Sequence, residues 1–256
     1  TQNTQPAILI VSCAIFSVLK KEYNFDFSHT KYFAGHSLGE YSALVSAGSL
    51  KFNDALNLVF ERGKSMQEAV PVGKGSMIAV LGSKITELTQ LIQQSKIAGV
   101  CEIANDNAAG QTIISGETNS INSLQGILKE NKKKCIPLNV SAPFHCSLMN
   151  PAAEVMKKKI YSVDFKKPAL DIICNVTSKP ENNPESIKKL LVEQIYSTVR
   201  WRESLINMHN EKVDNYIEIG PGKVLTGMVK RTLKDINCFS INSIDDMRKI
   251  INEFKK

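Results

Sequence analysis

The chain has 256 residues, of which 43% are hydrophobic and 22% charged, so it can bury a sizeable core and is not a disordered segment. Its 32 Lys and Arg against 25 Asp and Glu give a net charge of +7, which favours an anionic partner or substrate. No run of about 18 uninterrupted apolar residues occurs, which argues against a membrane protein or membrane partner.

The basic and cysteine residues exclude two further classes. Lysines cluster at 132–134, 157–159 and 166–167, but no aromatic residues of the kind that stack on bases lie between them, so nucleic acid is a poor partner. The six cysteines form no CxxC pair, which argues against a zinc site or a disulfide framework. We therefore expect free thiols, no metal and a cytoplasmic protein.

The N-terminal residues predict a helix, a strand and two further helices. Residues 6–19 are apolar and no basic residue precedes them, so we expect a buried helix rather than a signal peptide. Residues 31–35 predict a short strand, and residues 40–47 a helix directly after a tight turn. A second helix is expected over 55–66, capped by Asp54, because its apolar residues follow helical spacing.

In residues 76–137 the pattern of apolar and turn residues differs from that of the preceding helices, and it predicts the order β-α-β-β-α-β. A series of this kind folds as a ferredoxin-like α+β subdomain, which we expect as an insert over 72–136. The expected strands are 77–81, 100–105, 112–115 and 134–140, and the expected helices are 85–94 and 120–130.

After this insert, helices again alternate with strands. We expect helices over 150–160, 187–196, 201–210 and 224–232, a strand over 171–175 and a last strand over 216–219. Strands alternating with helices favour an α/β fold with a mainly parallel sheet and helices on both faces, in the manner of α/β-hydrolases. This catalytic subdomain is expected to comprise 1–71 and 137–256.

The turn after the first strand, Gly35-His-Ser37-Leu-Gly39, fits a nucleophile elbow. Such a turn presents the Ser37 hydroxyl at the start of a helix, where negative charge is stabilised. It also aims the backbone N–H of Leu38 at the oxyanion of a tetrahedral intermediate. A tight turn without chemistry has the same pattern, so the serine needs a base before it can be considered a nucleophile.

The chain offers four histidines as that base, and His145 is the best placed. It follows Pro143, which biases the backbone towards an extended shape that can project a side chain over a sheet edge. His36 would point away from the elbow, since it lies beside the serine. The other two occur in polar, surface-like stretches and are expected to be inert: His29 and His209.

Four separated motifs occur in a fixed order along the chain. They are GHSLGEYS from Gly35, RGKSMQ from Arg62, SAPFH from Ser141 and EIGPGKVLT from Glu218. Together they resemble the malonyl-CoA:acyl carrier protein transacylase family, and the resemblance extends from residue 1 to about residue 245, including the insert.

The resemblance implies a role for each matching position. Ser37 would be acylated by malonyl-CoA, with His145 acting first as general base and then as general acid. The backbone carbonyl of Gln194 would orient that histidine. Arg62 would grip the free malonyl carboxylate, for which a guanidinium offers a bidentate fork. Phe144 would limit the acyl pocket, although packing of a loop residue on the core is an alternative.

The resemblance also implies the partners: malonyl-CoA as substrate, the phosphopantetheine thiol of an acidic acyl carrier protein as acceptor, no cofactor and a monomeric enzyme. Asn105 and Gln111 flank the expected hairpin and could bind the thioester or the pantetheine arm, but a structural role is favoured. The nearest rival enzyme is a serine esterase or thioesterase, which shares GxSxG but does not need Arg62.

One departure from the family concerns the N-terminus. Members begin with a strand and a Gly-Gln-Gly-Ser-Gln loop, about 55 residues before the position of Thr1, and that loop supplies a second oxyanion N–H. The sequence given lacks this segment, so reduced activity is expected. A non-catalytic fragment that binds the carrier protein is therefore a further alternative.

Overall fold

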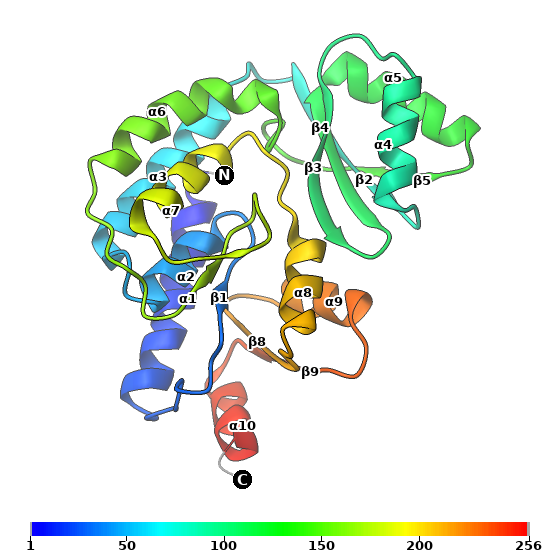
Figure 1. Ribbon diagram of the computed structural model, residues 1–256. Helices are drawn as coiled ribbons and strands as arrows, with labels where there is room; N and C mark the ends of the chain where they lie inside the picture. Colours follow the sequence, from blue (N-terminus) through cyan, green and yellow to red (C-terminus); the bar gives the residue numbers. More distant parts are fainter. Residues whose placement is uncertain (1, 255–256) are drawn as a thin grey trace.

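The computed structural model describes residues 2–254, which form two units side by side (Figure 1). The chain begins in the larger unit, forms the smaller one between residues 75 and 137, and then returns to the larger unit. The expected division of the chain into domains at 71/72 and 136/137 stays a prediction.

The smaller unit is the expected ferredoxin-like α+β layer. Its sheet has the order β3-β4-β2-β5, and all neighbouring strands are antiparallel. Ile78 and Ile114 of the sheet pack with Leu88 and Leu124 of the two helices in one apolar core. The elements are β2 (Gly75–Leu81), α4 (Ile85–Gln94), β3 (Cys101–Ala108), β4 (Gln111–Glu117), α5 (Thr118–Glu130) and β5 (Lys134–Pro137).

The larger unit is made mostly of helices around short strands. Its helices are α1 (Thr4–Lys21), α2 (Gly39–Ser46), α3 (Phe52–Glu68), the 3-10 turn η1 (Ser147–Met149), α6 (Asn150–Tyr161), α7 (Pro184–Glu193), α8 (Trp201–Asn210), α9 (Val224–Thr232) and α10 (Ile244–Phe254). Its strands are β1 (Phe33–Ala34), β6 (Ile172–Ile173), β7 (Pro180–Glu181), β8 (Asn215–Ile219) and β9 (Asn237–Ile241).

The α/β class is confirmed, but the strands of the larger unit are arranged differently from the expected single sheet. In the described part of the chain they form two separate sheets, one with the strand order β1-β6-β7 and the other with the pair β8-β9. The pairs β1–β6 and β8–β9 are parallel, as expected. β7 is antiparallel to β6, because the chain reverses direction after Asn175, with Ser178 at a φ of 55°.

The C-terminal residues contain two elements beyond the expected last strand. β9 pairs with β8 over five residues, and α10 then contributes Met247, Ile250 and Ile251 to an apolar cluster that also contains Ile15 and Leu19 of α1. At the start of α10 the Ser243 Oγ donates to the Asp246 carboxylate and accepts from the Asp246 backbone N–H, as in a helix cap. The expectation that the strand over 216–219 is the last one was therefore wrong.

Helix α1 is longer and less buried than expected. Leu9 and Leu19 are fully covered, whereas Ile10 is 43% and Val11 40% exposed, so only one face is in the core. Among the described residues, α1 is the one helix long and apolar enough to cross a membrane by length and composition, a test that core helices of soluble proteins also pass.

Asp54 does not cap its helix. α3 begins at Phe52 with Lys51 as the capping residue, so Asp54 lies within the first turn. Its carboxylate still lies near the positive end of the helix dipole. The apolar face of α3 was predicted correctly, because Ala55, Leu58, Val59 and Met66 are all buried.

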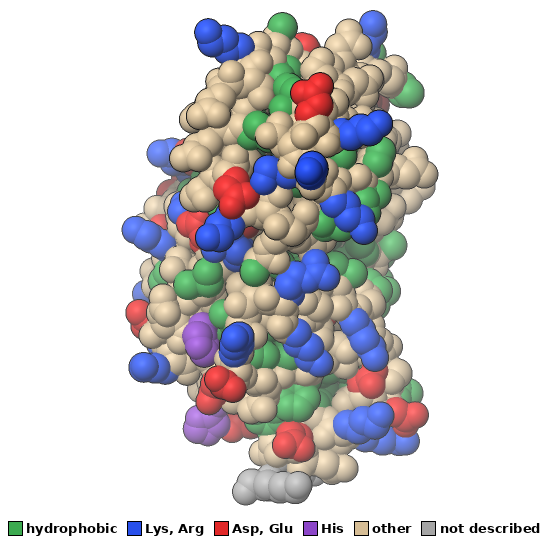
Figure 2. Space-filling view, turned by 90° about the vertical axis from the view of Figure 1, so that its right-hand side faces the viewer, with side chains coloured by type: hydrophobic (Ala, Val, Ile, Leu, Met, Phe, Trp, Pro, Cys, Tyr) green, Lys and Arg blue, Asp and Glu red, His purple; other side chains and the backbone are tan. Residues whose placement is uncertain are grey.

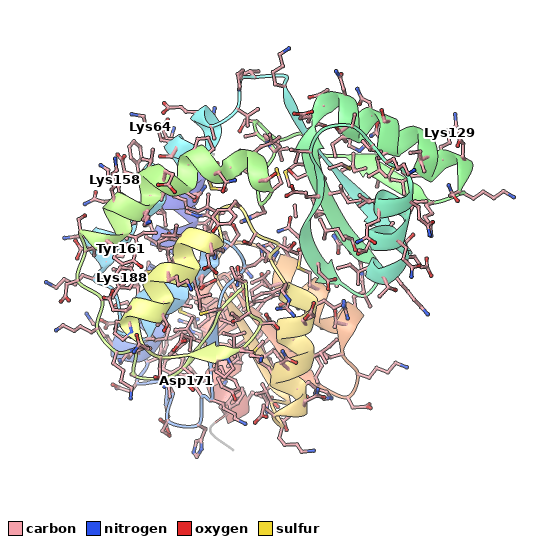
Figure 3. All side chains as sticks on the ribbon, turned by 45° about the horizontal axis from the view of Figure 1, so that its top comes forward. Lys64, Lys129, Lys158, Tyr161, Asp171 and Lys188 are labelled. Carbon is pink, nitrogen blue, oxygen red and sulfur yellow. The ribbon has the colours of Figure 1, made fainter. Side chains whose placement is uncertain are left out.

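Several lysines of the larger unit lie on its outer helices. Figure 3 shows Lys64 on α3 and Lys158 on α6 projecting away from the smaller unit, and both are exposed. Lys188 of α7 instead lies over the ring of Tyr161, 5.8 Å from its centre, and pairs with Glu185. Lys64 and Lys158 therefore lie on the outer surface of the helices, separate from the region where the two units meet.

Candidate active site

The turn between β1 and α2 has the geometry of a nucleophile elbow. Ser37 has a φ of 52°, a conformation that is uncommon outside glycine and costs about 1–3 kcal/mol. The side chain of Asn175 holds this turn in place. Its Oδ1 accepts from the Ser37 N–H at 2.7 Å, and its Nδ2 donates to the carbonyl of Gly35 at 2.8 Å.

The two glycines of the GxSxG turn have unequal surroundings. A Cβ on Gly35 would lie 1.9 Å from the carbonyl oxygen of Gly39, whereas a Cβ on Gly39 would meet no atom within 4 Å. The requirement for a small residue is therefore steric at Gly35, where two segments of backbone meet.

We predict that Gly35→Ala destabilises the protein by several kcal/mol, whereas Gly39→Ala does not, because an alanine at the start of α2 removes the entropic cost of glycine, about 0.5–1 kcal/mol. Urea unfolding of both variants against the parent measures the difference. Equal stabilities of the two variants would contradict the steric argument.

Ser37 and His145 form a hydrogen-bonded pair. The Ser37 Oγ lies 2.8 Å from the His145 Nε2, and the His145 Nδ1 lies 2.8 Å from the backbone carbonyl oxygen of Gln194. Because a carbonyl can only accept, Nδ1 must carry the proton, which leaves the lone pair of Nε2 facing the serine. This is the tautomer that a general base needs.

The environment of His145 keeps its ring neutral. Burial, and after it the nearby positive charge of Arg62, lower its pKa from 6.5 to about 3. The hydrogen bond to Gln194 opposes this shift. The imidazole can therefore accept a proton at neutral pH.

Arg62 is buried beside the serine, with 1% of its surface exposed. Its Nη2 donates to the Ser37 Oγ at 3.0 Å and to the Gln194 Oε1 at 2.9 Å, and its Nη1 donates to the Gln5 Oε1 at 2.7 Å. Within residues 2–254, no Asp or Glu forms an ion pair with this guanidinium. A buried cation surrounded by neutral acceptors is well suited to receive a carboxylate.

The other residues that the sequence singled out lie in different settings. Leu38 precedes α2, and its N–H makes no hydrogen bond within the described part of the chain, so its role at an oxyanion stays a prediction. Phe144 packs on the cores of both units, and its role in an acyl pocket also stays a prediction. Asn105 forms a β-bridge with Val199.

The remaining candidates make contacts away from the serine. Gln111 accepts from Arg231 at 2.9 Å. The ring of His36 bonds to Asn107 at 2.7 Å and packs edge-on against Trp201. All six cysteines are free thiols, and the described residues contain no group of three or more His, Cys, Asp or Glu side chains that could hold a metal.

The motif from Glu218 to Thr226 has a structural explanation. The Glu218 carboxylate accepts from the backbone N–H groups of Leu225 at 3.0 Å and Thr226 at 2.7 Å. These groups belong to the first turn of α9, whose unpaired donors a carboxylate can satisfy. This motif therefore fixes α9 against β8 rather than contributing to the serine site.

Sequence reasoning missed three residues of the site. Gln5 bonds to Arg62, Asn175 holds the elbow, and Glu40 accepts from the side chain of Gln194 at 2.8 Å. The side chain of Gln194, as distinct from its carbonyl, was also missed. Of these three residues only Glu40 lies in one of the four motifs, GHSLGEYS, and this position was the one signal in the sequence that it belongs to the site.

A cleft of about 440 Å³ adjoins the pair of Ser37 and His145. It lies between α4, the start of β3 and the segment after α7, and His145 forms part of its wall. Its other lining residues are Thr89, Ile92, Gln93, Cys101, Glu102, Ile103, Tyr196, Ser197 and Thr198.

Comparisons with known proteins agree with this geometry. Residues 1–254 match the model of the acyl transferase domain family. A malonyl CoA-acyl carrier protein transacylase of Bacillus subtilis is 40% identical over 259 residues, which cover all of this chain and 80% of the relative.

Two solved structures resemble the whole chain. The acyl-carrier-protein-S-malonyltransferase of Bartonella henselae superposes with a TM-score of 0.96 at 38% identity, covering 100% of this chain and 82% of the other. A malonyl-transacylase in complex with a type II PKS acyl-carrier protein superposes with a TM-score of 0.94 at 36% identity, covering 99% and 81%. The elbow, the buried arginine and these likenesses agree, and the chain belongs to the malonyl CoA-acyl carrier protein transacylase family of acyl transferases.

Proposed function

We propose that this protein transfers malonyl from coenzyme A to the phosphopantetheine thiol of an acyl carrier protein in fatty acid synthesis, through an ester on Ser37. One observation supports this most strongly: a single hydroxyl lies within hydrogen-bond distance of both His145 and the buried Arg62. The base would activate the nucleophile, and the arginine would hold a substrate that carries a carboxylate next to it.

In the first half-reaction, the Ser37 Oγ attacks the carbonyl carbon of the malonyl thioester as its proton passes to the His145 Nε2. The oxyanion that forms lies at the start of α2, where the N–H of Leu38 and the helix dipole would stabilise it. The carbon–sulfur bond then breaks, the thiolate of coenzyme A takes the proton from His145, and the malonyl ester of Ser37 remains.

In the second half-reaction, the pantetheine thiol gives its proton to His145 and attacks the ester carbonyl. The bond to the Ser37 Oγ breaks, and the serine takes the proton back. Arg62 would hold the malonyl carboxylate through both steps, because its bidentate fork stays charged inside the protein. Its present contact with the hydroxyl would then be exchanged for contacts with the substrate.

The surface charge fits an acidic carrier protein. Figure 2 shows more Lys and Arg than Asp and Glu on the face that includes the smaller unit and α9. Lys230 and Arg231 in the last turn of α9 are exposed. A positive face accelerates the approach of a negatively charged partner. We propose an acidic acyl carrier protein as the partner on this ground, while a monomeric state and a cytoplasmic setting stay predictions from the sequence.

A serine esterase or thioesterase is the second candidate. Hydrolases with GxSxG usually orient their histidine with a carboxylate. Here the His145 Nδ1 faces a backbone carbonyl instead, and a hydrolase of neutral esters has no use for a buried arginine beside the serine. Both features favour transfer of an acidic acyl group.

The experiment is mass spectrometry of the protein after mixing with malonyl-CoA, followed by addition of a holo acyl carrier protein. The proposal predicts one malonyl group on the peptide with Ser37, which then appears on the carrier. Release of free malonate at the same rate without carrier would support a hydrolase. Absence of the adduct with retained carrier binding would support a non-catalytic binding protein.

The neutral state of His145 predicts an unusual pH profile. At saturating malonyl-CoA, the rate constant for Ser37 acylation should change by less than about twofold between pH 7 and pH 5, because a base with its pKa at about 3 stays unprotonated there. Rapid-quench measurement of the acyl-enzyme tests this. A rate that falls with protonation of a group near 6.5 would contradict it.

A further inference from the structure

Glu40 is a buried acid that the reaction scheme above does not use. It lies in the first turn of α2, three residues after the nucleophile, with 1% of its surface exposed. No basic side chain within the described residues forms an ion pair with it. A buried, unpaired carboxyl is costly to keep in a fold, so its contacts call for an explanation.

The contacts of Glu40 join two segments of the site. Its Oε2 accepts from the backbone N–H of Asn175 at 3.1 Å and from the Nε2 of Gln194 at 2.8 Å. Asn175 in turn holds the elbow, and the carbonyl side of the Gln194 amide accepts from Arg62. The carboxyl is thus linked to the guanidinium through a single amide group.

The orientation of that amide follows from its neighbours. The Gln194 Nε2 faces acceptor oxygens of Ser37, Glu40 and Asn175, at 3.0, 2.8 and 3.3 Å. Turned by half a rotation, the amide would place its oxygen against these oxygens and its NH₂ group against the donors of Arg62. Glu40 makes the shortest of the three contacts, so it contributes strongly to the observed orientation.

We propose, on the basis of the malonyl transfer proposed above, that Glu40 is a positioning residue for malonyl recognition. It keeps the side-chain Oε1 of Gln194 directed towards Arg62, and this contact aims the guanidinium at Ser37. It also moderates the positive charge that Arg62 offers to the malonyl carboxylate. Both effects act through other residues, since Glu40 itself does not contact the hydroxyl of Ser37.

The charge of Glu40 should change near neutral pH. Burial raises its pKa to about 7, against the opposing effects of its hydrogen bonds and of Arg62. The ionisable groups that face it are Arg62 on α3, Cys174 after β6 and Tyr41 on its own helix. The pKa values of Cys174 and Tyr41 are raised by burial, so neither loses a proton near pH 7. Malonyl binding should therefore weaken as pH rises through 7 and Glu40 becomes negative.

The test compares the full chain with Glu40→Gln, Glu40→Leu and the control Glu68→Gln, an exposed glutamate on α3. The KM values of malonyl-CoA and acetyl-CoA for Ser37 acylation are measured for each. We expect Glu40→Leu to raise the KM of malonyl-CoA by about tenfold and that of acetyl-CoA by less than about twofold, because acetyl has no carboxylate for Arg62. Glu40→Gln should restore the malonyl KM, since its amide oxygen can accept from the same two donors.

Three results would overturn the inference: an unchanged malonyl KM in Glu40→Leu, equal losses for both substrates, or no restoration by Glu40→Gln. If Glu40→Leu does not fold, the pH dependence decides. The malonyl KM of the parent should rise through pH 7 and that of Glu40→Gln should stay flat, whereas identical profiles would contradict the inference. Failure of malonyl-CoA to acylate the parent at all would instead contradict the proposed function.

Discussion

Ser37→Ala is expected to abolish the malonyl-enzyme and with it the transfer to the carrier protein. Within the described residues, no hydroxyl other than that of Ser37 is hydrogen-bonded to both His145 and Arg62. We therefore expect no other group to replace it as the nucleophile. His145→Ala should leave slow acylation, about 10²- to 10⁴-fold below the parent, because a base increases the reactivity of the serine but is not consumed.

Rapid-quench assays with labelled malonyl-CoA measure both variants. Two exposed or partly exposed positions serve as controls, Ser123→Ala on α5 and His209→Ala on α8, and neither should change the rate. Undiminished transfer by Ser37→Ala would refute the nucleophile. A rate of His145→Ala equal to that of the parent would refute the base.

Arg62→Ala is expected to lose malonyl transfer and to gain relative acceptance of acetyl-CoA. The substitution removes the two N–H donors of the guanidinium that would bind the malonyl carboxylate, whereas an acetyl group has no carboxylate to bind there. Arg62→Lys should restore malonyl transfer only in part, because a lysine supplies a point charge in place of two parallel donors.

The ratio of kcat/KM for malonyl-CoA to that for acetyl-CoA is the quantity to compare. Arg248→Ala, on the exposed face of α10, is the control and should leave the ratio unchanged. Because Arg62 is buried, its loss also removes contacts with Gln5 and Gln194, so thermal melting should be recorded for each variant. Equal losses for both substrates would show that Arg62 supports the fold rather than recognises the carboxylate.

Local elements could be predicted closely from the sequence. Helices α4, α8 and α9 have the expected bounds, because each has an apolar face at helical spacing and a turn on either side. The smaller unit also follows from the order of its elements, since a β-α-β-β-α-β series has few ways to bury its apolar faces. β9 and α10 were missed, although residues 244–254 carry apolar residues at helical spacing.

The arrangement of the larger unit could not be predicted in the same way. Its parallel strands pair over distances in sequence that a local pattern does not record, such as Phe33 with Ile172. Some of these strands are two residues long in the structure, too short to show a period of their own. The expectation of one continuous sheet therefore went beyond what the alternation of strands and helices supports.

The sequence by itself determined the elbow at Ser37 and, through the four motifs, pointed to His145, Arg62 and Gln194. These motifs are short and local, so the residue types at fixed spacing are enough to indicate them. Only the tertiary structure decided that Glu40 meets Gln194, 154 residues away, and that Gln5 meets Arg62, 57 residues away. Hydrogen bonds of this kind depend on which helices pack together, and packing is set by the whole core rather than by any segment that contributes to it.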